Sequence, residues 1–367
     1  MKWLLKIIDA ARPTFEEGGK LQIFNPVFEA LEHVFFAPPT RTIGAPHIRD
    51  PLDVKRVMSM VIISAIPCVL AAFYFFGLRF LAMIIVSYAA GLTVEVIFAI
   101  VRKEGINEGF FVTGILFPLI LPPNLPLWMV GLGVAFGVFI GKELFGGTGR
   151  NIFNPALVGR CFLSLAYPKT MAASWVEPSH ELTGGLLTWV SPSLDAVSGA
   201  TPLALAKQGE MGSVAHQLFG SVSGSAGETS AILIILSGVF LLFTRVASWR
   251  TVVSMLGSFV ILTAALIVGG AVAYPIPGVF GPVMWHLFAG GLLFGAFYMA
   301  TDPVTSPTTN TGKWLYGIII GSTTVLIRNF TGYVEGVTFA ILLGNIVAPI
   351  LDEIVIGIRL RRLRNER

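Results

Sequence analysis

The strongest constraint on this fold is a series of long apolar runs that begins after residue 56. A membrane-spanning helix needs about 20 apolar residues, fewer where it is broken, and about ten such runs follow one another. Only 13% of the 367 residues are charged, whereas soluble domains carry about 25%. We therefore expect an all-α integral membrane protein with about ten transmembrane helices. The runs cover residues 57–77, 80–101, 110–121, 126–141, 153–167, 230–245, 252–274, 284–300, 314–328 and 337–358.

Proline and glycine interrupt two of these runs. The third and fifth runs are short, and turn-forming residues crowd around them. Irregular backbone at membrane depth is typical of broken or re-entrant helices, which line functional sites in transporters. The interrupting residues are Pro118, Pro122, Pro123, Pro126 and the stretch Gly146-Gly147-Thr148-Gly149.

The distribution of Lys and Arg predicts which side of the membrane each loop faces, because cytoplasmic loops carry an excess of both. With the N-terminus inside, the inner loops are basic, whereas residues 168–229 hold two lysines and five acidic residues. The net charge of +4 does not indicate nucleic-acid binding, since the basic residues lie at segment ends. We expect a cytoplasmic segment 1–56, a first membrane repeat 57–167, a periplasmic segment 168–229, a second repeat 230–358 and a basic cytoplasmic tail 359–367.

A faint internal echo predicts that the two halves are related. The stretch from Leu127-Trp128 to Asn154-Pro155 resembles the stretch from Lys313-Trp314 to Gly344-Asn345. These stretches begin on the fourth and ninth apolar runs, and an odd offset in spans reverses the direction of the chain through the membrane. We therefore expect two inverted five-helix repeats, like those of urea transporters, with the functional site at the junction between them.

The motif with the clearest chemistry lies in the predicted periplasmic segment. It matches the Asp-x-x-Ser/Thr-Gly-Ala-Thr acceptor signature of proteins that carry FMN on a threonine hydroxyl through a phosphoester. Small residues before a hydroxyl nucleophile leave room for a transferase and then for a ring system. The alternative is an ordinary turn in which the threonine caps a helix that starts at Pro202. The motif comprises Asp195, which could assist deprotonation or bind a metal during transfer, Ser198, Gly199, Ala200 and the acceptor Thr201.

Short motifs are distributed along nearly the whole chain. They are Pro46-His47-Ile48-Arg49-Asp50, Asn107-Glu108-Gly109-Phe110-Phe111, Gly146-Gly147-Thr148-Gly149-Arg150-Asn151 with Asn154-Pro155-Ala156, Ala300-Thr301-Asp302-Pro303-Val304-Thr305-Ser306-Pro307, Glu335-Gly336-Val337 and Pro349-Ile350-Leu351-Asp352. Together with the acceptor motif, they make the chain resemble the NqrB/RnfD family. These proteins are multi-pass subunits of the sodium-translocating NADH:quinone oxidoreductase and of a ferredoxin-linked relative, and the resemblance implies the bacterial inner membrane.

The resemblance implies a redox function that the chain does not perform alone. It implies covalent FMN on Thr201, a second, non-covalent flavin (riboflavin), a quinone site near the cytoplasmic side, and coupling to Na+ translocation. No GxGxxG motif follows a strand, so NADH oxidation belongs to a partner. The implied partners are an NADH-oxidising flavoprotein, a second subunit with covalent FMN, small membrane subunits and the flavin transferase that matures the protein.

Acidic residues near or within the apolar runs are candidates for the ion pathway, because charges at membrane depth are costly. In the resemblance, Glu108, Asp302 and Asp352 match positions connected with sodium uptake or quinone reactivity. Carboxylates beside freed main-chain carbonyls offer the hard oxygen ligands that Na+ prefers. Glu95 is a fourth candidate, with a structural ion pair to another helix as the alternative. We expect quinone near Gly105 and Glu108.

Polar residues at the glycine-rich interruption are candidates for the second flavin. Gly149, Asn151 and Asn154 could hydrogen-bond a flavin edge, or they could satisfy main-chain groups at the ends of a broken helix. No catalytic residue is assigned. The five histidines are scattered, so we expect no metal site.

Three further residues receive structural interpretations. We expect His286 to be a hydrogen-bonded histidine of the helix bundle. Cys68 and Cys161 lie in apolar stretches without a CxxC partner, so we expect buried small side chains and no redox pair.

Two other functions share parts of this pattern. The polar segment with Glu16-Glu17-Gly18-Gly19-Lys20 favours NqrB, whereas Thr305-Ser306-Pro307 and residues 335–340 read more like RnfD. A solute channel of the urea-channel kind would have the same predicted architecture. A passive channel has no use for an FMN acceptor, so Thr201 discriminates between a channel and a redox subunit.

Overall fold

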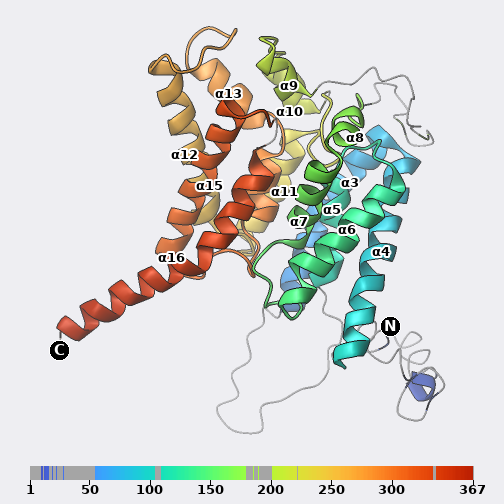
Figure 1. Cartoon of the computed structure of the whole chain (residues 1–367). Helices are drawn as coiled ribbons and strands as arrows, with labels where there is room; N and C mark the ends of the chain where they lie inside the picture. The colour runs from blue at the N-terminus through green and yellow to red at the C-terminus, as the bar shows by residue number, and fades with distance from the viewer. Residues whose placement is uncertain are drawn as a thin grey trace.

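The computed structural model describes residues 54–103, 109–178, 201–220, 222–333 and 336–366, with isolated residues before 54 and at 185 and 189. The predicted N-terminal segment 1–56 therefore lies almost entirely outside the described residues. Within the described part the protein is helical, and the β structure amounts to one antiparallel bridge between Gly77 and Trp189. The fold is thus an all-α bundle, as the sequence predicts (Figure 1).

The first half consists of five apolar helices in the predicted order. They are α3 (Val54–Phe76), α4 (Leu78–Arg102), α5 (Gly109–Leu119), α6 (Leu127–Gly141), with the short 3-10 turn η2 (Glu143–Phe145) behind it, and α7 (Pro155–Ala166). Helix α5 stops just before Pro122 and Pro123, which lack the N–H donors that a helix needs. Helix α7 starts at Pro155 because Asn154 caps it, with the Asn154 Oδ1 accepting from the Ala156 N–H at 3.0 Å.

Three short helices follow in the segment predicted to be periplasmic. They are α8 (Pro168–Ala173), α9 (Pro202–Lys207) and α10 (Val214–Phe219). Figure 1 shows α9 and α10 together at one end of the bundle, opposite the C-terminal end of α4.

The second half repeats the series with one long break. Its helices are α11 (Ala231–Phe243), α12 (Trp249–Val268), α13 (Phe280–Phe288), α14 (Leu292–Phe294) with the π-helical turn η3 (Gly295–Met299), α15 (Asn310–Phe330) and α16 (Val337–Asn365). Helix α13 and the α14–η3 pair are bent by 65° relative to each other. Gly290 occupies the break with φ +63°, a conformation that glycine adopts without strain.

Helix contacts in the two halves match in order, as two copies of one structural repeat would require. Helix α4 packs against α5 and α6 as α12 packs against α13 and α15, and α6 packs on α7 as α15 packs on α16. Helices α3 and α11, which open the two halves, contact each other. In this correspondence α6 of the first half is equivalent to α15 of the second half, as the sequence echo predicts.

Fewer helices than the predicted ten satisfy a length and composition criterion for membrane crossing among the described residues. Each predicted run lies on a helix or, for residues 284–300, on the broken α13–α14–η3 series. By length and composition, the described residues contain five helices able to cross a membrane, or up to six if the bent pair is one span. The count of ten is not confirmed, because α5, α7 and α11 are too short by this measure and α15 is not among the candidate spans.

Glycines allow neighbouring helices to approach closely, which is how helices associate in a lipid environment. A Cβ on Gly137 would meet the main-chain oxygen of Pro155, and one on Gly159 would meet that of Gly133. In the second half, a Cβ on Gly317 would meet the Ser254 hydroxyl, and one on Gly321 would meet the main-chain oxygen of Met255. These contacts set α7 against α6, and α12 against α15.

Candidate functional site

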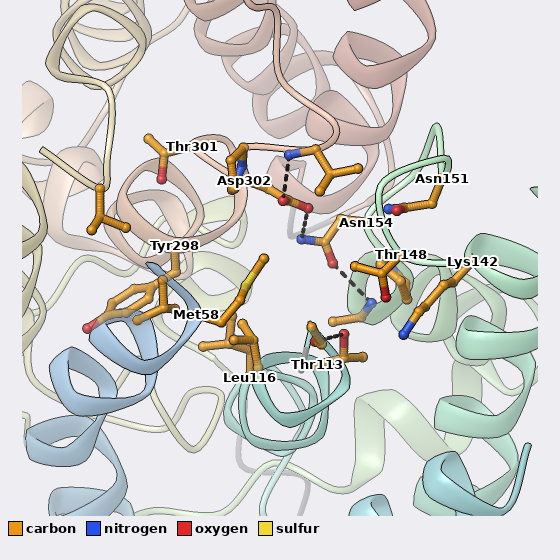
Figure 2. Close-up of a pocket in the computed structure, with 18 of the residues that line it drawn as sticks. Met58, Thr113, Leu116, Lys142, Thr148, Asn151, Asn154, Tyr298, Thr301 and Asp302 are labelled. Atoms are coloured by element: carbon orange, nitrogen blue, oxygen red, sulfur yellow. Dashed lines mark hydrogen bonds between the residues drawn. The ribbon is translucent and has the colours of Figure 1, made fainter. Parts of the chain in front are cut away.

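A polar cavity lies at the junction of the two halves, where the inverted repeat predicts a site. Segments from both halves contribute to its wall, including α3, α5 and α7 from the first half and η3 from the second. We call it the inner cavity (Figure 2). Its polar lining consists of Lys142, Thr148, Asn151, Asn154, Tyr298, Thr301 and Asp302, and its apolar lining includes Met58, Val61 and Leu116.

Two of the predicted flavin residues line this cavity and also hold the broken helix in place. Asn151 accepts a hydrogen bond from the Gly149 N–H at 3.2 Å and donates to the Phe153 carbonyl at 3.0 Å. Asn154 caps α7 through Oδ1, while its Nδ2 faces the Asp302 carboxylate at 3.4 Å. Capping and cavity lining, which the sequence presented as alternatives, are therefore combined in the same side chains.

Asp302 is half-buried on the opposite side of the cavity from Lys142. Its carboxylate accepts hydrogen bonds from the Val304 N–H at 3.1 Å and the Thr305 hydroxyl at 3.2 Å. Burial raises the pKa of Asp302, and these two donors partly oppose that rise. Among the described residues, no Lys or Arg lies within ion-pair distance of this carboxylate.

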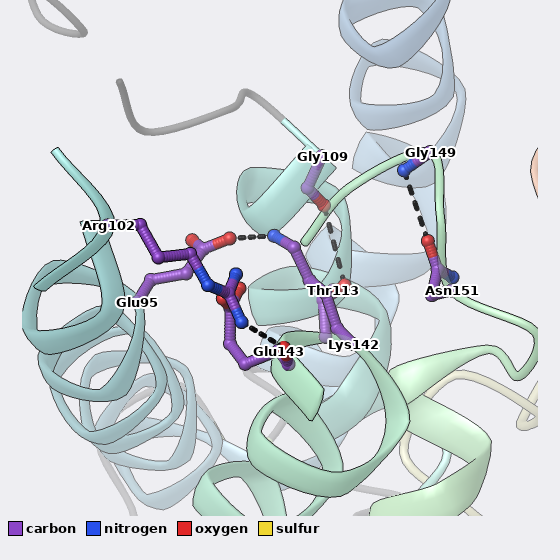
Figure 3. Close-up of polar contacts among 8 residues, drawn as sticks. All are labelled: Glu95, Arg102, Gly109, Thr113, Lys142, Glu143, Gly149 and Asn151. Carbon is purple, nitrogen blue, oxygen red and sulfur yellow. Dashed lines mark hydrogen bonds and ion pairs between the residues drawn. The ribbon is translucent and has the colours of Figure 1, made fainter. Parts of the chain in front are cut away.

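A buried ion-pair cluster forms the wall on the side of α4 and α6 (Figure 3). Lys142 pairs with Glu95, and both side chains are at most 5% exposed. The neighbouring Arg102 pairs with Glu143 at 2.8 Å. Lys142, one of the basic residues of the predicted inner loops, is therefore not a free cation. Glu95 takes the structural partner that we considered as its alternative role.

The inner cavity has the chemistry that a planar, polar ring system requires. Met58, Val61 and Leu116 provide apolar surface for the faces of a ring, and Asn154 places an amide at its edge. The buried Thr148 hydroxyl lines the cavity without a hydrogen-bond partner among the described residues. An unsatisfied buried hydroxyl favours a ligand with polar edge atoms, so these residues fit a non-covalent flavin.

Asp352, another predicted ion-pathway residue, lies away from this cavity and has a different environment. Its carboxylate accepts four hydrogen bonds at the start of α15, from the main-chain N–H and the hydroxyl of Thr308 and of Thr309, at 2.5–3.0 Å. It ties α16 to the N-terminal end of α15. The observed geometry assigns it a structural connection, and ion transport through it stays a prediction.

Thr201 lies at the other end of the bundle and is 6% exposed. It caps α9, its Oγ1 accepting from the Ala204 N–H at 3.3 Å, with Pro202 at the first helical position. This is the helix cap that we considered as the alternative to flavin attachment. The cap uses the hydroxyl as an acceptor only, so its proton and second lone pair are compatible with attachment.

A second cavity adjoins Thr201, and we call it the outer cavity. Its lining includes Thr201, Leu203, Gln217, Glu228, Ala289 and Gly290. Glu228 forms a buried ion pair with Arg160 of α7 at 3.5 Å, and Arg160 also donates to the Ser225 hydroxyl at 3.4 Å. The sequence assigned Glu228 to an acidic periplasmic surface, and the structure instead buries it.

Several predicted site residues lie outside the described residues. They are Gly105 and Glu108 of the proposed quinone site, and Asp195, Ser198, Gly199 and Ala200 of the flavin-attachment motif. Gly109, the described residue that follows Glu108 in the chain, lines the inner cavity.

Sequence reasoning missed four buried cations among the described residues, Arg79, Lys142, Arg160 and Arg328. The available signal was a lone basic residue within or at the end of an apolar run, which is rare unless it has a buried partner. It did not reveal which acid would be the partner. His286 also differs from expectation, since its Nε2 has no hydrogen-bond partner among the described residues. Cys68 is buried and Cys161 half-buried, both as free thiols.

Comparison with known proteins gives a consistent result over nearly the whole chain. A model described as the NQR2, RnfD, RnfE family matches residues 41–359. The chain is 36% identical over 424 aligned residues to the NqrB component of the Na(+)-translocating NADH-quinone reductase of Klebsiella pneumoniae (strain 342), with 99% of both proteins covered. It is 38% identical over 407 residues to the protein of the same name in Chromohalobacter salexigens, covering 97% of this chain and 94% of the relative. The corresponding Ectopseudomonas mendocina protein is 36% identical over 407 residues, with 97% of each covered.

Proposed function

Because the chain belongs to the NQR2, RnfD, RnfE family, we propose that it is the NqrB component of a Na+-translocating NADH:quinone reductase in the bacterial inner membrane. The observation that carries this proposal is the similarity of 97–99% of the chain to relatives with that name. The all-α fold with several apolar helices supports a multi-pass membrane protein. The described residues contain no strand beyond an isolated bridge, and NADH oxidation is assigned to a partner protein of the complex.

The finer part of the proposal is that Thr201 carries FMN through a phosphoester. The acceptor motif supports it, and so does a structure in which the Thr201 hydroxyl is part of a cavity wall. In the attachment step a flavin transferase presents an activated FMN, such as a flavin dinucleotide. The Thr201 oxygen forms a bond to phosphorus, the bond to the nucleotide leaving group breaks, and the hydroxyl proton is lost.

We assign the second, non-covalent flavin to the inner cavity. Asn154 and Thr148 would hold its polar edge, and Lys142 would place a positive charge beside it. A bound flavin supplies electron transfer between a two-electron donor and a one-electron carrier, here on the way to quinone. The predicted quinone residues, Gly105 and Glu108, directly precede Gly109 of the same cavity wall.

For Na+ we propose a route that includes Asp302. This half-buried carboxylate has no described cationic partner; Thr301 directly precedes it in the chain, and the Thr305 hydroxyl donates a hydrogen bond to it. Oxygen ligands of this kind suit a hard monovalent cation. Glu95 is less suited to the role, because Lys142 already compensates its charge.

Mass spectrometry of the complex, purified after co-expression with its flavin transferase, tests the central claim. We expect the peptide that contains Thr201 to carry the mass of FMN joined by a phosphoester, and Thr201→Ala to abolish it. Ser213→Ala is the matched control, because Ser213 caps the equally short α10 through Ala215 N–H at 3.2 Å. An unmodified Thr201 peptide from the mature complex would contradict the flavin role and favour a channel.

A further inference from the structure

The last part of α16 leaves the helix bundle as a separate arm. Leu351 is the last buried residue of this helix, and residues 352–366 are all half-buried or exposed. A Cβ on Gly357 would meet no atom within 4 Å. Figure 1 shows this part of α16 extending sideways from the bundle, away from the end that carries α9 and α10. We call residues 353–365 the C-terminal arm.

The place where the arm leaves the bundle is fixed by one side chain. Asp352, directly before the arm, accepts hydrogen bonds from Thr308 and Thr309 at the start of α15. The predicted orientation places the start of α15 and the basic tail on the cytoplasmic side. The arm therefore starts near the cytoplasmic surface of the membrane.

The arm combines a row of exposed apolar side chains with arginines along both edges of that row. Ile356, Leu360 and Leu363 recur at intervals of four and three residues, so they share one face of the helix, and all three are exposed. Arg359 lies four residues before Leu363 and borders one edge of this row. Arg364 lies four residues after Leu360 and borders the other edge.

Other roles explain only part of this pattern. A topology signal accounts for basic residues at a cytoplasmic end, but it does not require an exposed apolar row. Interaction with the helix dipole is confined to the last turn, whereas Arg359 and Arg361 lie before it. A partner protein could cover an apolar row. However, the stretch 354–365 holds four arginines and no acidic residue, which favours a surface that is negatively charged along its whole length.

We propose that the C-terminal arm lies in the headgroup layer of the cytoplasmic leaflet and binds anionic phospholipid. Helices in this layer place apolar side chains at the acyl boundary and Lys or Arg beside the phosphates. Here Ile356, Leu360 and Leu363 enter the boundary. Arg359 and Arg364 extend along it to the headgroups, where the planar guanidinium can donate two parallel hydrogen bonds to one phosphate. This interaction goes beyond the redox and ion functions proposed above and does not depend on them.

Photocrosslinking from the arm tests this assignment in the intact complex. The complex is reconstituted in nanodiscs of one part phosphatidylglycerol to three parts phosphatidylcholine, with p-benzoylphenylalanine in place of Leu360, which keeps an apolar side chain in the row. Mass spectrometry of the irradiated peptide identifies the captured molecule. We expect lipid adducts in which phosphatidylglycerol exceeds its share of the bilayer by about twofold or more.

Two double variants in this background separate a local contact from general attraction to the membrane. Arg359→Gln/Arg364→Gln removes the arginines that border the apolar row, and it should reduce phosphatidylglycerol adducts to the lipid's share of the bilayer. The control is Lys103→Gln/Arg245→Gln, which removes the same charge at two exposed residues outside the arm. This control should leave the enrichment unchanged.

Four outcomes would overturn the inference. Adducts with a partner polypeptide would identify the arm as a protein-docking surface, and the absence of any adduct would place it in water. Lipid adducts in proportion to bilayer composition would remove the preference for anionic lipid. Equal enrichment in Arg359→Gln/Arg364→Gln and in the control would show that these arginines do not bind the headgroups.

Discussion

The inner and outer cavities both hold charges inside an apolar bundle, but the charges have different partners. Around the inner cavity, Lys142 and Arg102 are each paired with a glutamate, whereas the Asp302 carboxylate has no Lys or Arg within ion-pair distance among the described residues. At the outer cavity, Glu228 forms an ion pair with Arg160. A charge removed from water is costly unless it is paired or hydrogen-bonded. The comparison therefore sets a carboxylate that only hydrogen bonds support against a carboxylate in an ion pair.

Arg328, which lies behind the wall of the outer cavity, and Asp302 are also held differently. Main-chain carbonyls hold Arg328 in one position. Asp302 is held by the side-chain amide of Asn154 and by a loop of residues 301–309 that follows a π-helical turn. Such turns occur frequently at functional sites. The comparison shows that helix ends fix the buried cation, whereas side chains and a loop support the carboxylate.

The largest effect is expected where an inner-cavity ion pair is broken. Lys142→Met would leave Glu95 buried without a partner, and breaking a buried pair on one side costs about 3–5 kcal/mol. Thermal unfolding of the purified complex measures the loss, and the double variant Lys142→Met/Glu95→Gln should recover most of it. Arg362→Ala, which removes an exposed pair with Glu366, should change stability by less than about 0.5 kcal/mol. Equal effects of the two single changes would show that the inner pair is not desolvated.

The next effect concerns the packing of the outer cavity. A Cβ on Gly291 would meet the Glu228 carboxylate, so Gly291→Ala should displace Glu228 from Arg160 and destabilise the complex by about 1–3 kcal/mol. The control is Gly332→Ala, at a glycine with no atom within 4 Å of its added Cβ. The measurement is again the unfolding temperature. A harmless Gly291→Ala would mean that the outer charges are not rigidly held.

A smaller effect separates the two roles of Asn154. Asn154→Ser keeps a capping oxygen for α7 and loses the amide that faces Asp302, whereas Asn154→Ala loses both. We expect only Asn154→Ala to lose the cap contribution of about 1 kcal/mol. Both variants should lose non-covalent flavin, measured by extraction and fluorescence. Full flavin content in Asn154→Ser, together with wild-type stability, would restrict Asn154 to capping.

The smallest effect is the pH dependence that Asp302 contributes. Burial raises the pKa of this carboxyl above its ordinary value of 3.8, so the folded state binds the proton more tightly than the unfolded state. That contribution to stability is present at low pH and is lost as pH rises through the raised pKa. The unfolding temperature of Asp302→Asn minus that of the wild type should therefore rise as pH increases above about 4. If this temperature difference stays constant from pH 4 to 8, the charge of Asp302 is compensated in the folded state.

The sequence predicted the helical elements well, because their signal is local. The ten apolar runs correspond to helical segments, and the cap of α7 at Asn154-Pro155 follows from residue types alone. The same holds for Thr201, whose motif and whose position before Pro202 are both legible in the chain. The glycine-rich interruption indicated that the polypeptide breaks there, and the structure confirms this.

Partnership between distant residues was decided only by the tertiary structure. The chain order places Glu95 and Lys142 on different runs, and Arg160, Glu228 and Arg328 on three different segments, so no local pattern relates them. The number of spans stays a prediction, since hydropathy does not report whether a short helix crosses the membrane or ends inside it. Composition and motifs determined that this chain is a helical membrane protein of a redox family. Helix packing decided which buried charges have a partner, because the free-energy cost of burying a charge depends on all the groups that surround it.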